Sequence, residues 1–271
     1  MTVVAMTMEL GVRGDEVAAG VAKALGIRIV ANDLAERVAG RAKVKKSLVQ
    51  RLREGKASLL ERLWAPGGEI ALFTAEEVFA AAQAGDALIR GWGSTLLLRP
   101  VAHIPCVRVC APLEARVKTL MKRLDTDDDA YVREEIAASD DAHAAAMQSR
   151  FRVRWGDPVL YDLTLNTGRV SIASCVEQVV ALAGRPEFQE TEKSRAQLAS
   201  LALEAGVRAA LAAAPETAKV DVTVIAKGGR VTLRGMVEDE KERKGAATVA
   251  ARTAGVSDLV NELRTMRRPR R

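Results

Sequence analysis

The chain has 271 residues and a net charge of +6, and 48% of its residues are hydrophobic while 28% are charged. This composition predicts a soluble chain with a real core, in one large domain or two ordinary ones. No stretch is long and apolar enough to span a bilayer, and the first residues lack the pattern of a secretory signal. Two histidines and three cysteines without a CxxC pair predict neither a metal site nor a disulfide framework, which suits the reducing cytoplasm.

Short apolar runs alternate with helical patterns over the first part of the chain. The apolar runs predict strands at 3–6, 27–30, 87–90, 105–110 and 163–166. Helical patterns between them predict helices at 14–25, 75–84, 112–124, 127–151 and 171–183, and residues 46–64 are amphipathic and basic. Such alternation predicts an α/β fold, in which helices cover both faces of a parallel sheet. We assign this unit to residues 1–185.

The pattern changes after residue 184. A polar stretch with Pro186 predicts a linker at 186–194. A helix at 195–213, a strand at 220–226, a hairpin turn at Gly228–Gly229, a strand at 231–237, a helix at 239–253 and a strand at 256–265 predict a small αββαβ unit over 195–266. Four arginines make residues 267–271 a basic tail. The tail is either a contact for an anionic surface or a solubilising end; we favour the latter and predict no nucleic-acid partner.

Residues 7–18, TMELGVRGDEVA, have the outline of a phosphate-binding loop: an apolar strand, a glycine-containing turn and a helix. Gly11 and Gly14 would let the backbone approach an anion closely. The usual lysine is missing, although Arg13 offers a positive charge nearby. Asp15 suits the helix start but repels a phosphate. Two interpretations stay open, a phosphate-binding loop and an ordinary strand–turn–helix connection.

Both units resemble known families. Residues 1–185 resemble the cytidylate kinase-like family, a branch of the P-loop nucleoside monophosphate kinases. The markers are TMELGVRGDEVA, ANDLAERVA (31–39), RGWGSTLLLR (90–99), CAPLEARVKTLMKR (110–123) and WGDPVLYDLTLNT (155–167). The C-terminal unit resembles a BON domain through VDVTVIAKGGRVTLRGMV (220–237) and GVSDLVNEL (255–263). The resemblance associates this domain with lipid or partner interaction, and here we favour a protein partner or self-association.

The kinase resemblance implies a set of site residues. It assigns binding of ATP with Mg²⁺ to Gly11, Arg13, Gly14 and Asp15. It assigns binding of the nucleotide substrate to Asp33, Gly91, Trp92 and Gly93, and catalysis to Arg116, Arg123 and Asp162. Simpler interpretations stay open: Asp33 as a helix-start residue, Trp92 as a cleft filler, and the two arginines as a solvated helix face.

Three charge-bearing positions depart from the family pattern. Gly14 stands where ordinary P-loops have lysine, Trp92 replaces the arginine of glycine–arginine–glycine, and His143 replaces a lid arginine that follows Asp140. Arg150, with Arg152 and Arg154, is a reserve of charge beside Trp155. Phosphoryl transfer depends on electrostatic positioning, so these changes predict a cytoplasmic nucleotide-binding or regulatory module with weak or lost transfer. The alternatives are an active kinase that phosphorylates CMP or dCMP, and a scaffold for assembly through the BON unit that needs no nucleotide.

Overall fold

The computed structural model describes residues 1–31, 33–49, 67–91 and 93–266. Most of the amphipathic segment predicted at 46–64 and the arginine tail therefore lie outside the described residues. So do Trp92 and the side chain of Asp33.

The first part of the chain builds a five-stranded parallel sheet in the order β2-β3-β1-β4-β5. The strands are β1 (Val3–Met8), β2 (Arg28–Val30), β3 (Ala87–Arg90), β4 (Cys106–Cys110) and β5 (Leu163–Asn166). The central strands are continuous apolar runs because both faces of the sheet are covered. Val3, Val4, Ala5 and Met6 of β1 are all buried. The predicted α/β fold is confirmed.

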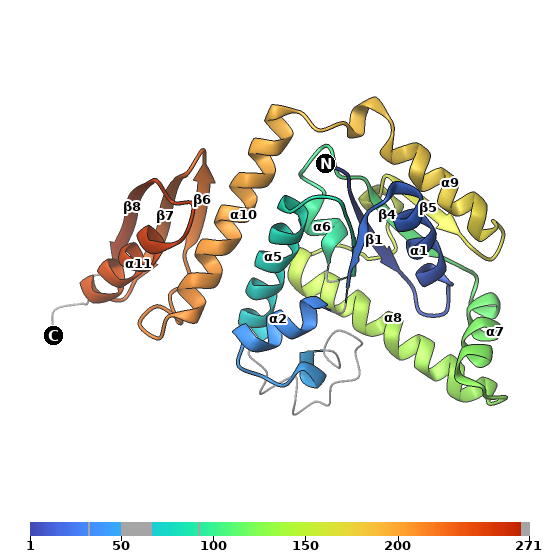
Figure 1. Cartoon of the computed structure of the whole chain (residues 1–271). Coiled ribbons are helices and arrows are strands. Elements are labelled where there is room, and N and C mark those ends of the chain that lie inside the picture. The colour runs from blue at the N-terminus through green and yellow to red at the C-terminus, as the bar shows by residue number, and fades with distance from the viewer. Residues whose placement is uncertain (32, 50–66, 92, 267–271) are drawn as a thin grey trace.

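Helices cover the two faces of this sheet (Figure 1). On one face lie α1 (Gly14–Leu25) and α9 (Ile172–Ala183), which pack Val17, Val21, Cys175 and Val179 against β1 and β4. The other face is covered by α5 (Gly67–Gln83), α6 (Ser94–Leu98) and α10 (Glu192–Ala213). The short helix α2 (Asp33–Arg41) packs on α5. The helix predicted at 75–84 thus begins earlier, at Gly67.

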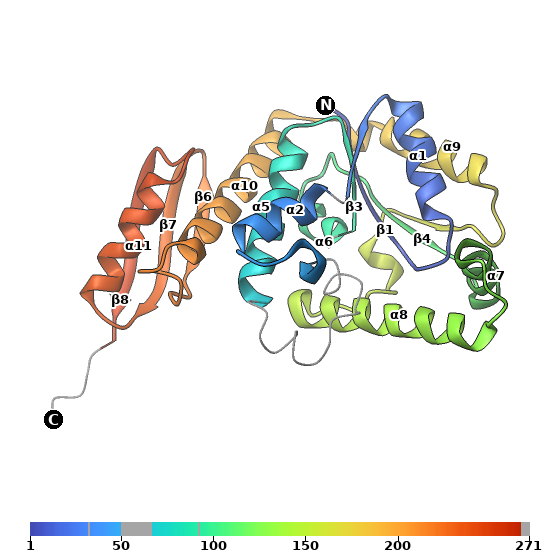
Figure 2. The same cartoon turned by 60° about the horizontal axis from the view of Figure 1, so that its bottom comes forward.

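A helical hairpin lies beyond the sheet. It consists of α7 (Leu113–Leu124) and α8 (Asp129–Phe151), which pack on each other through Val117, Leu120, Val132 and Ile136. Figure 2 shows α8 running along one side of the molecule with α7 at its end. This hairpin reaches the end of the sheet at which β1 and β3 finish.

The C-terminal unit has its own three-stranded sheet. A hairpin joins β6 (Thr223–Lys227) to β7 (Arg230–Val237), with φ of 56° at Gly228 and 85° at Gly229. Helix α11 (Glu240–Arg252) leads to β8 (Asp258–Thr265), which pairs with β7 in parallel. The predicted αββαβ unit is confirmed, and no described residue of it pairs into the first sheet.

Helix α10 belongs to both parts of the molecule. Leu198 and Ala205 pack into the core beside the first sheet, while Val207 and Leu211 pack into the core of the second. The helix begins at Glu192 because Thr191 and Ser194 form a capping box. The stretch predicted as a linker, 186–194, therefore holds a 3-10 turn (Pro186–Phe188) and the first residues of α10. The exact boundaries of the two domains stay a prediction.

We expect the start of α10 to be sensitive to pH, because His103 is buried against it. Its Nδ1 lies 2.8 Å from the Ser194 Oγ, and both residues are buried. Burial lowers the pKa of His103, so the fold favours the neutral ring. A lowered pKa in the folded state means that the stabilising contribution is complete above the unfolded pKa of about 6.5 and is lost as the pH falls below it.

We therefore expect the melting temperature to fall as the pH drops from about 7 to about 5.5. His103→Asn removes the titrating ring and should flatten this part of the profile. The check is differential scanning fluorimetry of both proteins across that range. An identical slope in the variant would show that other groups cause the loss.

Candidate functional site

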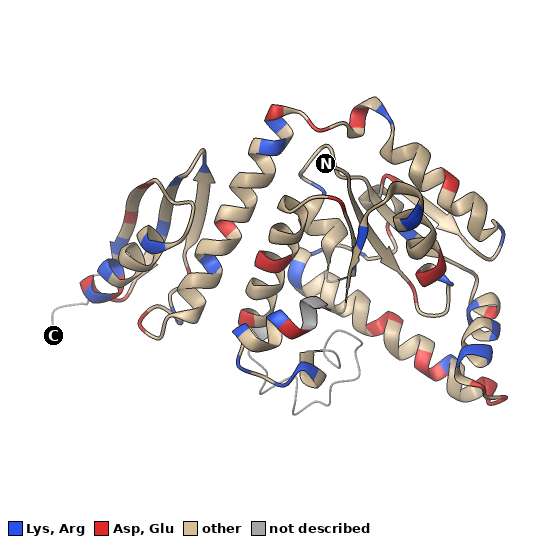
Figure 3. Cartoon of the chain, viewed as in Figure 1, with Lys and Arg blue, Asp and Glu red and all other residues tan. Residues whose placement is uncertain are grey.

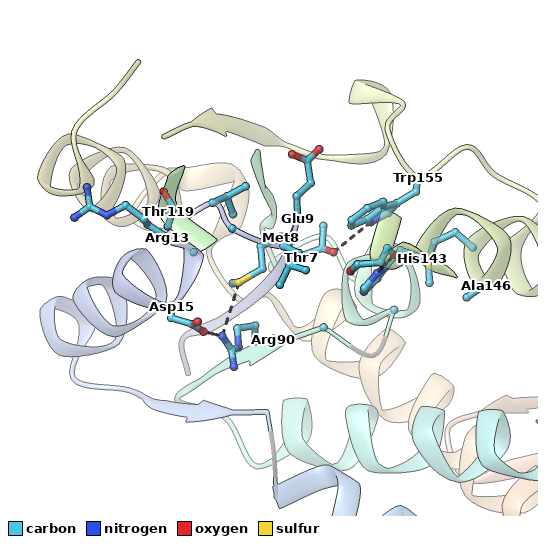
Figure 4. A pocket seen from close by; sticks show the side chains of 18 of the residues that line it. Thr7, Met8, Glu9, Arg13, Asp15, Arg90, Thr119, His143, Ala146 and Trp155 are labelled. Atoms are coloured by element: carbon cyan, nitrogen blue, oxygen red, sulfur yellow. Dashed lines mark hydrogen bonds and ion pairs between the residues drawn. The ribbon is translucent and has the colours of Figure 1, made fainter. Parts of the chain in front are cut away.

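A cavity of about 1200 Å³ opens where β1 and β3 end (Figure 4). Its floor is the loop that joins β1 to α1, and its walls come from α5, α7 and α8. The lining residues used below are Val49, Ile70, Arg90, Lys118, Lys122, Arg123, His143, Met147, Arg150 and Trp155, together with the loop itself. Ligands of parallel α/β sheets bind at this edge.

The loop between β1 and α1 requires glycine at residue 11. Gly11 has φ of +85°, and a Cβ there would lie 2.7 Å from the backbone oxygen of Arg116. Gly14 packs closely on Met8, since a Cβ would lie 2.5 Å from the Met8 Sδ. Arg13 precedes α1 in a left-handed conformation and makes no side-chain cap. The N-terminus of α1 therefore meets the cavity without a side-chain cap, as an anion site requires.

The two charged side chains of this loop are engaged with neighbours. Arg13 binds Glu16, with its Nη2 2.6 Å from Glu16 Oε2, and this hydrogen bond raises the pKa of Arg13. Figure 4 shows the Arg13 side chain directed away from Arg90. Asp15 forms an ion pair with Arg90. The charge that Arg13 was expected to offer is thus already held by Glu16.

Four further cations line the cavity. Lys118, Lys122 and Arg123 come from α7, and Arg150 comes from α8. None of these four has a hydrogen bond or ion pair with another residue in the described part of the chain. Desolvation lowers the pKa of Arg150, which a bound anion would reverse. Figure 3 shows basic residues gathered on α7.

Every carboxylate that lines the described cavity faces an arginine. Glu16 and Asp15 are paired as above. Glu9 Oε1 accepts a hydrogen bond from Arg108 Nη2 at 2.6 Å, and its other oxygen lies 3.5 Å from Arg116 Nη1. Among the described residues that line it, the cavity therefore has an excess of positive charge over its acidic groups.

An aromatic pair forms another part of the wall. His143 stacks on Trp155 with ring centroids 4.8 Å apart and an interplanar angle of 17°. The His143 Nδ1 lies 2.7 Å from the backbone oxygen of Ser139, to which it donates. The Trp155 Nε1 donates to the Thr7 Oγ1 at 3.3 Å, and the Arg108 guanidinium lies 4.5 Å from the indole. His143 thus supplies a flat ring where the family resemblance expects an arginine.

Most of the residues predicted from sequence meet in this cavity. Those that line it are Gly11, Arg13, Gly14, Asp15, Gly91, Gly93 and Arg123. Trp92 and the side chain of Asp33 lie outside the described residues. The roles assigned to all of these residues stay predictions.

The other two predicted residues lie elsewhere. Arg116 is buried behind the loop: its Nε donates to the Leu10 backbone oxygen at 2.8 Å, and its Nη1 and Nη2 donate to Asp140 at 2.8 and 2.7 Å. Asp162 Oδ2 accepts from the Cys106 amide at 2.7 Å, at the start of β5. Neither is among the cavity's lining residues. Their contacts are structural, and a catalytic role for them is untested.

Sequence reasoning assigned no role to Lys118 and Lys122. The two residues are four apart on one predicted helix and follow a marker of the family, so their common face was a usable signal. The wall formed by Ile70 had no such signal, because an apolar helical residue has the pattern of a core residue. Among the described residues, no cluster of three His, Cys, Asp or Glu side chains could hold a metal ion. No described helix is long and apolar enough to cross a membrane.

Comparison with models of known families shows the family to which each part of the chain is related. Residues 3–169 match the model of the cytidylate kinase-like family, and residues 200–266 match that of the BON domain. The chain belongs to the cytidylate kinase-like family and carries a C-terminal BON domain.

A solved structure shares the fold of this chain, and two kinases match it more weakly. An uncharacterized protein from Eubacterium ventriosum ATCC 27560 matches with a TM-score of 0.54 and 16% identity, over 68% of this chain and 100% of its own. A shikimate kinase from Bacteroides thetaiotaomicron matches with a TM-score of 0.40 and 13% identity, over 67% of this chain and 97% of its own. A sugar kinase from Janibacter sp. HTCC2649 has a TM-score of 0.41 and 16% identity, over 70% of this chain and 99% of its own. No curated protein matches significantly.

Proposed function

We propose that the cavity binds a nucleotide through its phosphates and that phosphoryl transfer from it is weak or lost. The observation that carries this proposal is the uncapped N-terminus of α1 opposite Lys118, Lys122, Arg123 and Arg150, four cations without a hydrogen bond or ion pair to another described residue. Backbone N–H groups at a helix start and convergent cations are the two elements of a phosphate site. A cavity of about 1200 Å³ also has room for a nucleotide, with His143 and Met147 as apolar surface for a base.

ATP with Mg²⁺ is the nucleotide that the family resemblance implies, and it would supply the phosphoryl group. The lining carboxylates of the described chain are all paired with arginines. We therefore infer that Mg²⁺ would be held mainly by phosphate oxygens and water, as is common for this ion. The cationic wall suits the phosphates of such a complex.

The contacts that the charged side chains of the cavity already make favour weak phosphoryl transfer. Arg13 is held by Glu16, and Arg90 by Asp15, so neither guanidinium is free to meet a transferring phosphoryl group. His143 stacks on Trp155 in place of a lid arginine. Losing one preorganised hydrogen-bond donor typically costs about 2.7–4 kcal/mol of transition-state stabilisation.

An active kinase that phosphorylates CMP or dCMP is the second candidate. Arg123 and Arg150 favour it, because both line the cavity without a partner in the described chain and would provide lid charge. Isothermal titration with ATP–Mg²⁺, CMP and dCMP, paired with a turnover assay, separates the two. We expect binding of ATP and a turnover far below the enzyme median of about 10 per second. Turnover near that median would establish the active kinase instead.

Removing one cation should weaken nucleotide binding measurably. A hydrogen bond to a charged group contributes about 1.5–3 kcal/mol, so we expect Arg150→Met or Lys122→Met to raise the Kd for ATP by about tenfold or more. Arg252→Met is the matched control, because it removes an exposed arginine of α11 that does not line the cavity. Equal affinity in all three variants would contradict a phosphate site at these residues.

The same proposal places the protein in the cytoplasm, where nucleotides are available. It assigns the BON domain to a protein partner or to self-association. The arginine tail is treated as a solubilising end.

A further inference from the structure

One face of α10 forms the back of the cavity wall. Ala209 packs in a single buried cluster with Phe73 and Ile70 of α5 and with Val49. Ile70 and Val49 line the cavity themselves. One buried layer therefore separates the cavity from α10.

The opposite face of α10 is part of the BON core. Val207 and Leu211, two positions on either side of Ala209, pack with Val224 and Leu233 of the second sheet. Both are almost completely buried, with 0% and 3% of their surface exposed. The residues that touch the two units thus alternate within the same two turns of one helix.

Polar contacts also fix strand β6 to α10. Glu204 Oε1 accepts a hydrogen bond from the Ala226 amide at 3.0 Å, and Arg208 Nη2 donates to the Val224 backbone oxygen at 2.8 Å. Both side chains are only partly buried. They bind the strand's backbone, so a movement of β6 acts directly on the helix.

We propose that the BON domain regulates the cavity through α10: a partner that shifts the BON sheet changes the affinity of the cavity for nucleotide. This inference rests on the proposed nucleotide site. Close-packed interiors transmit displacement rather than absorb it, and the path from β6 to Ile70 is buried throughout. Coupling of this kind is reciprocal, so nucleotide must in turn stabilise the β6–α10 contact. Its usual size is roughly a 5- to 150-fold change in affinity.

The test loosens β6 from α10 without touching the cavity. The double variant Glu204→Met, Arg208→Met keeps most of the side-chain volume and removes both polar contacts. We expect it to bind ATP at least fivefold more weakly by isothermal titration, because the wall at Ile70 is less well ordered. The matched control is Arg230→Met, Arg234→Met, which removes the exposed ion pairs to Asp258 and Glu262 on the same sheet. The control should bind ATP like the unaltered protein.

Hydrogen exchange of the unaltered full-length chain provides a second readout that needs no variant. Saturating ATP should slow exchange of the β6 amides at 223–227, which lie in the BON domain. If ATP binds, but neither β6 exchange nor the affinity of the double variant changes, the coupling is overturned while the nucleotide site stands. If the unaltered chain binds no ATP, the proposed function fails, and the coupling with it. Should the double variant unfold, the exchange experiment alone decides.

Discussion

Gly11→Ala should weaken ATP binding by roughly a hundredfold. The added Cβ would lie 2.7 Å from the Arg116 backbone oxygen, at a residue with φ of +85°. This distance is shorter than a Cβ and a backbone oxygen can approach. The loop must therefore move away from α7 by a large fraction of an ångström. A misplacement of about 1 Å in a catalytic site can lower the rate about 100-fold, and we expect a loss of similar size in affinity because the N–H groups of the loop must face the phosphates. Isothermal titration with ATP–Mg²⁺ measures the effect directly.

Gly26 provides a control that separates the effect of backbone strain from the effect of a displaced loop. Gly26 ends α1 with φ of +68°, but a Cβ there meets nothing within 4 Å. Gly26→Ala should therefore cost about 1 kcal/mol of stability or somewhat more and leave ATP affinity unchanged. If Gly11→Ala binds ATP as tightly as Gly26→Ala does, the β1–α1 loop is an ordinary connection rather than a phosphate site.

Arg116→Met should lower the free energy of unfolding by about 3 kcal/mol. Removing one partner of a buried ion pair costs about 3–5 kcal/mol, since the remaining charge is left without compensation. Here the carboxylate of Asp140 loses two hydrogen bonds and the Leu10 oxygen loses one. The lower end of the range applies because the Asp140 side chain is 35% exposed. Urea denaturation at neutral pH gives the value.

The control lies on the same helical hairpin. Arg133 joins Glu114 and Asp129 through three contacts of 2.6–2.8 Å, but all of these groups are exposed to solvent. Exposed pairs contribute little, so Arg133→Met should leave the denaturation midpoint nearly unchanged. An Arg116→Met protein with full stability and a turnover below that of the unaltered protein would instead support the catalytic role that the family resemblance implies.

The sheet and the hairpin could be predicted because local patterns determine them. Buried parallel strands must be continuous apolar runs, and Gly228–Gly229 provides the positive φ angles of a tight turn. The partners of the charged residues could not be predicted in this way. Arg116 and Asp140 are 24 residues apart on different helices, and only the packing of α7 on α8 brings them together.

Part of the candidate site was also predictable, because local sequence patterns determine it. Gly11 of the β1–α1 loop carries a signal in the sequence, because few other residues accept its conformation. Arg13 has the pattern of a free cation, and only the structure shows its contact with Glu16, three residues along the helix. Helix α10 begins at Glu192 and not at 195, because its capping box of Thr191 and Ser194 lacks the glutamate or glutamine by which such a box is read from a sequence.

The shared helix limits how this protein could have been assembled from modules. The match to the kinase-like family ends at residue 169, and the match to the BON domain begins at residue 200. In sequence, the chain therefore looks like two independent units joined end to end. In three dimensions the 22-residue helix α10 covers apolar residues of both, among them Val78 and Phe79 on one side and Val224 on the other. A recombination that took either unit without this helix would leave an apolar face open to water. The two units therefore cannot easily be separated again. We expect substitutions on α10 to require matching substitutions in both units.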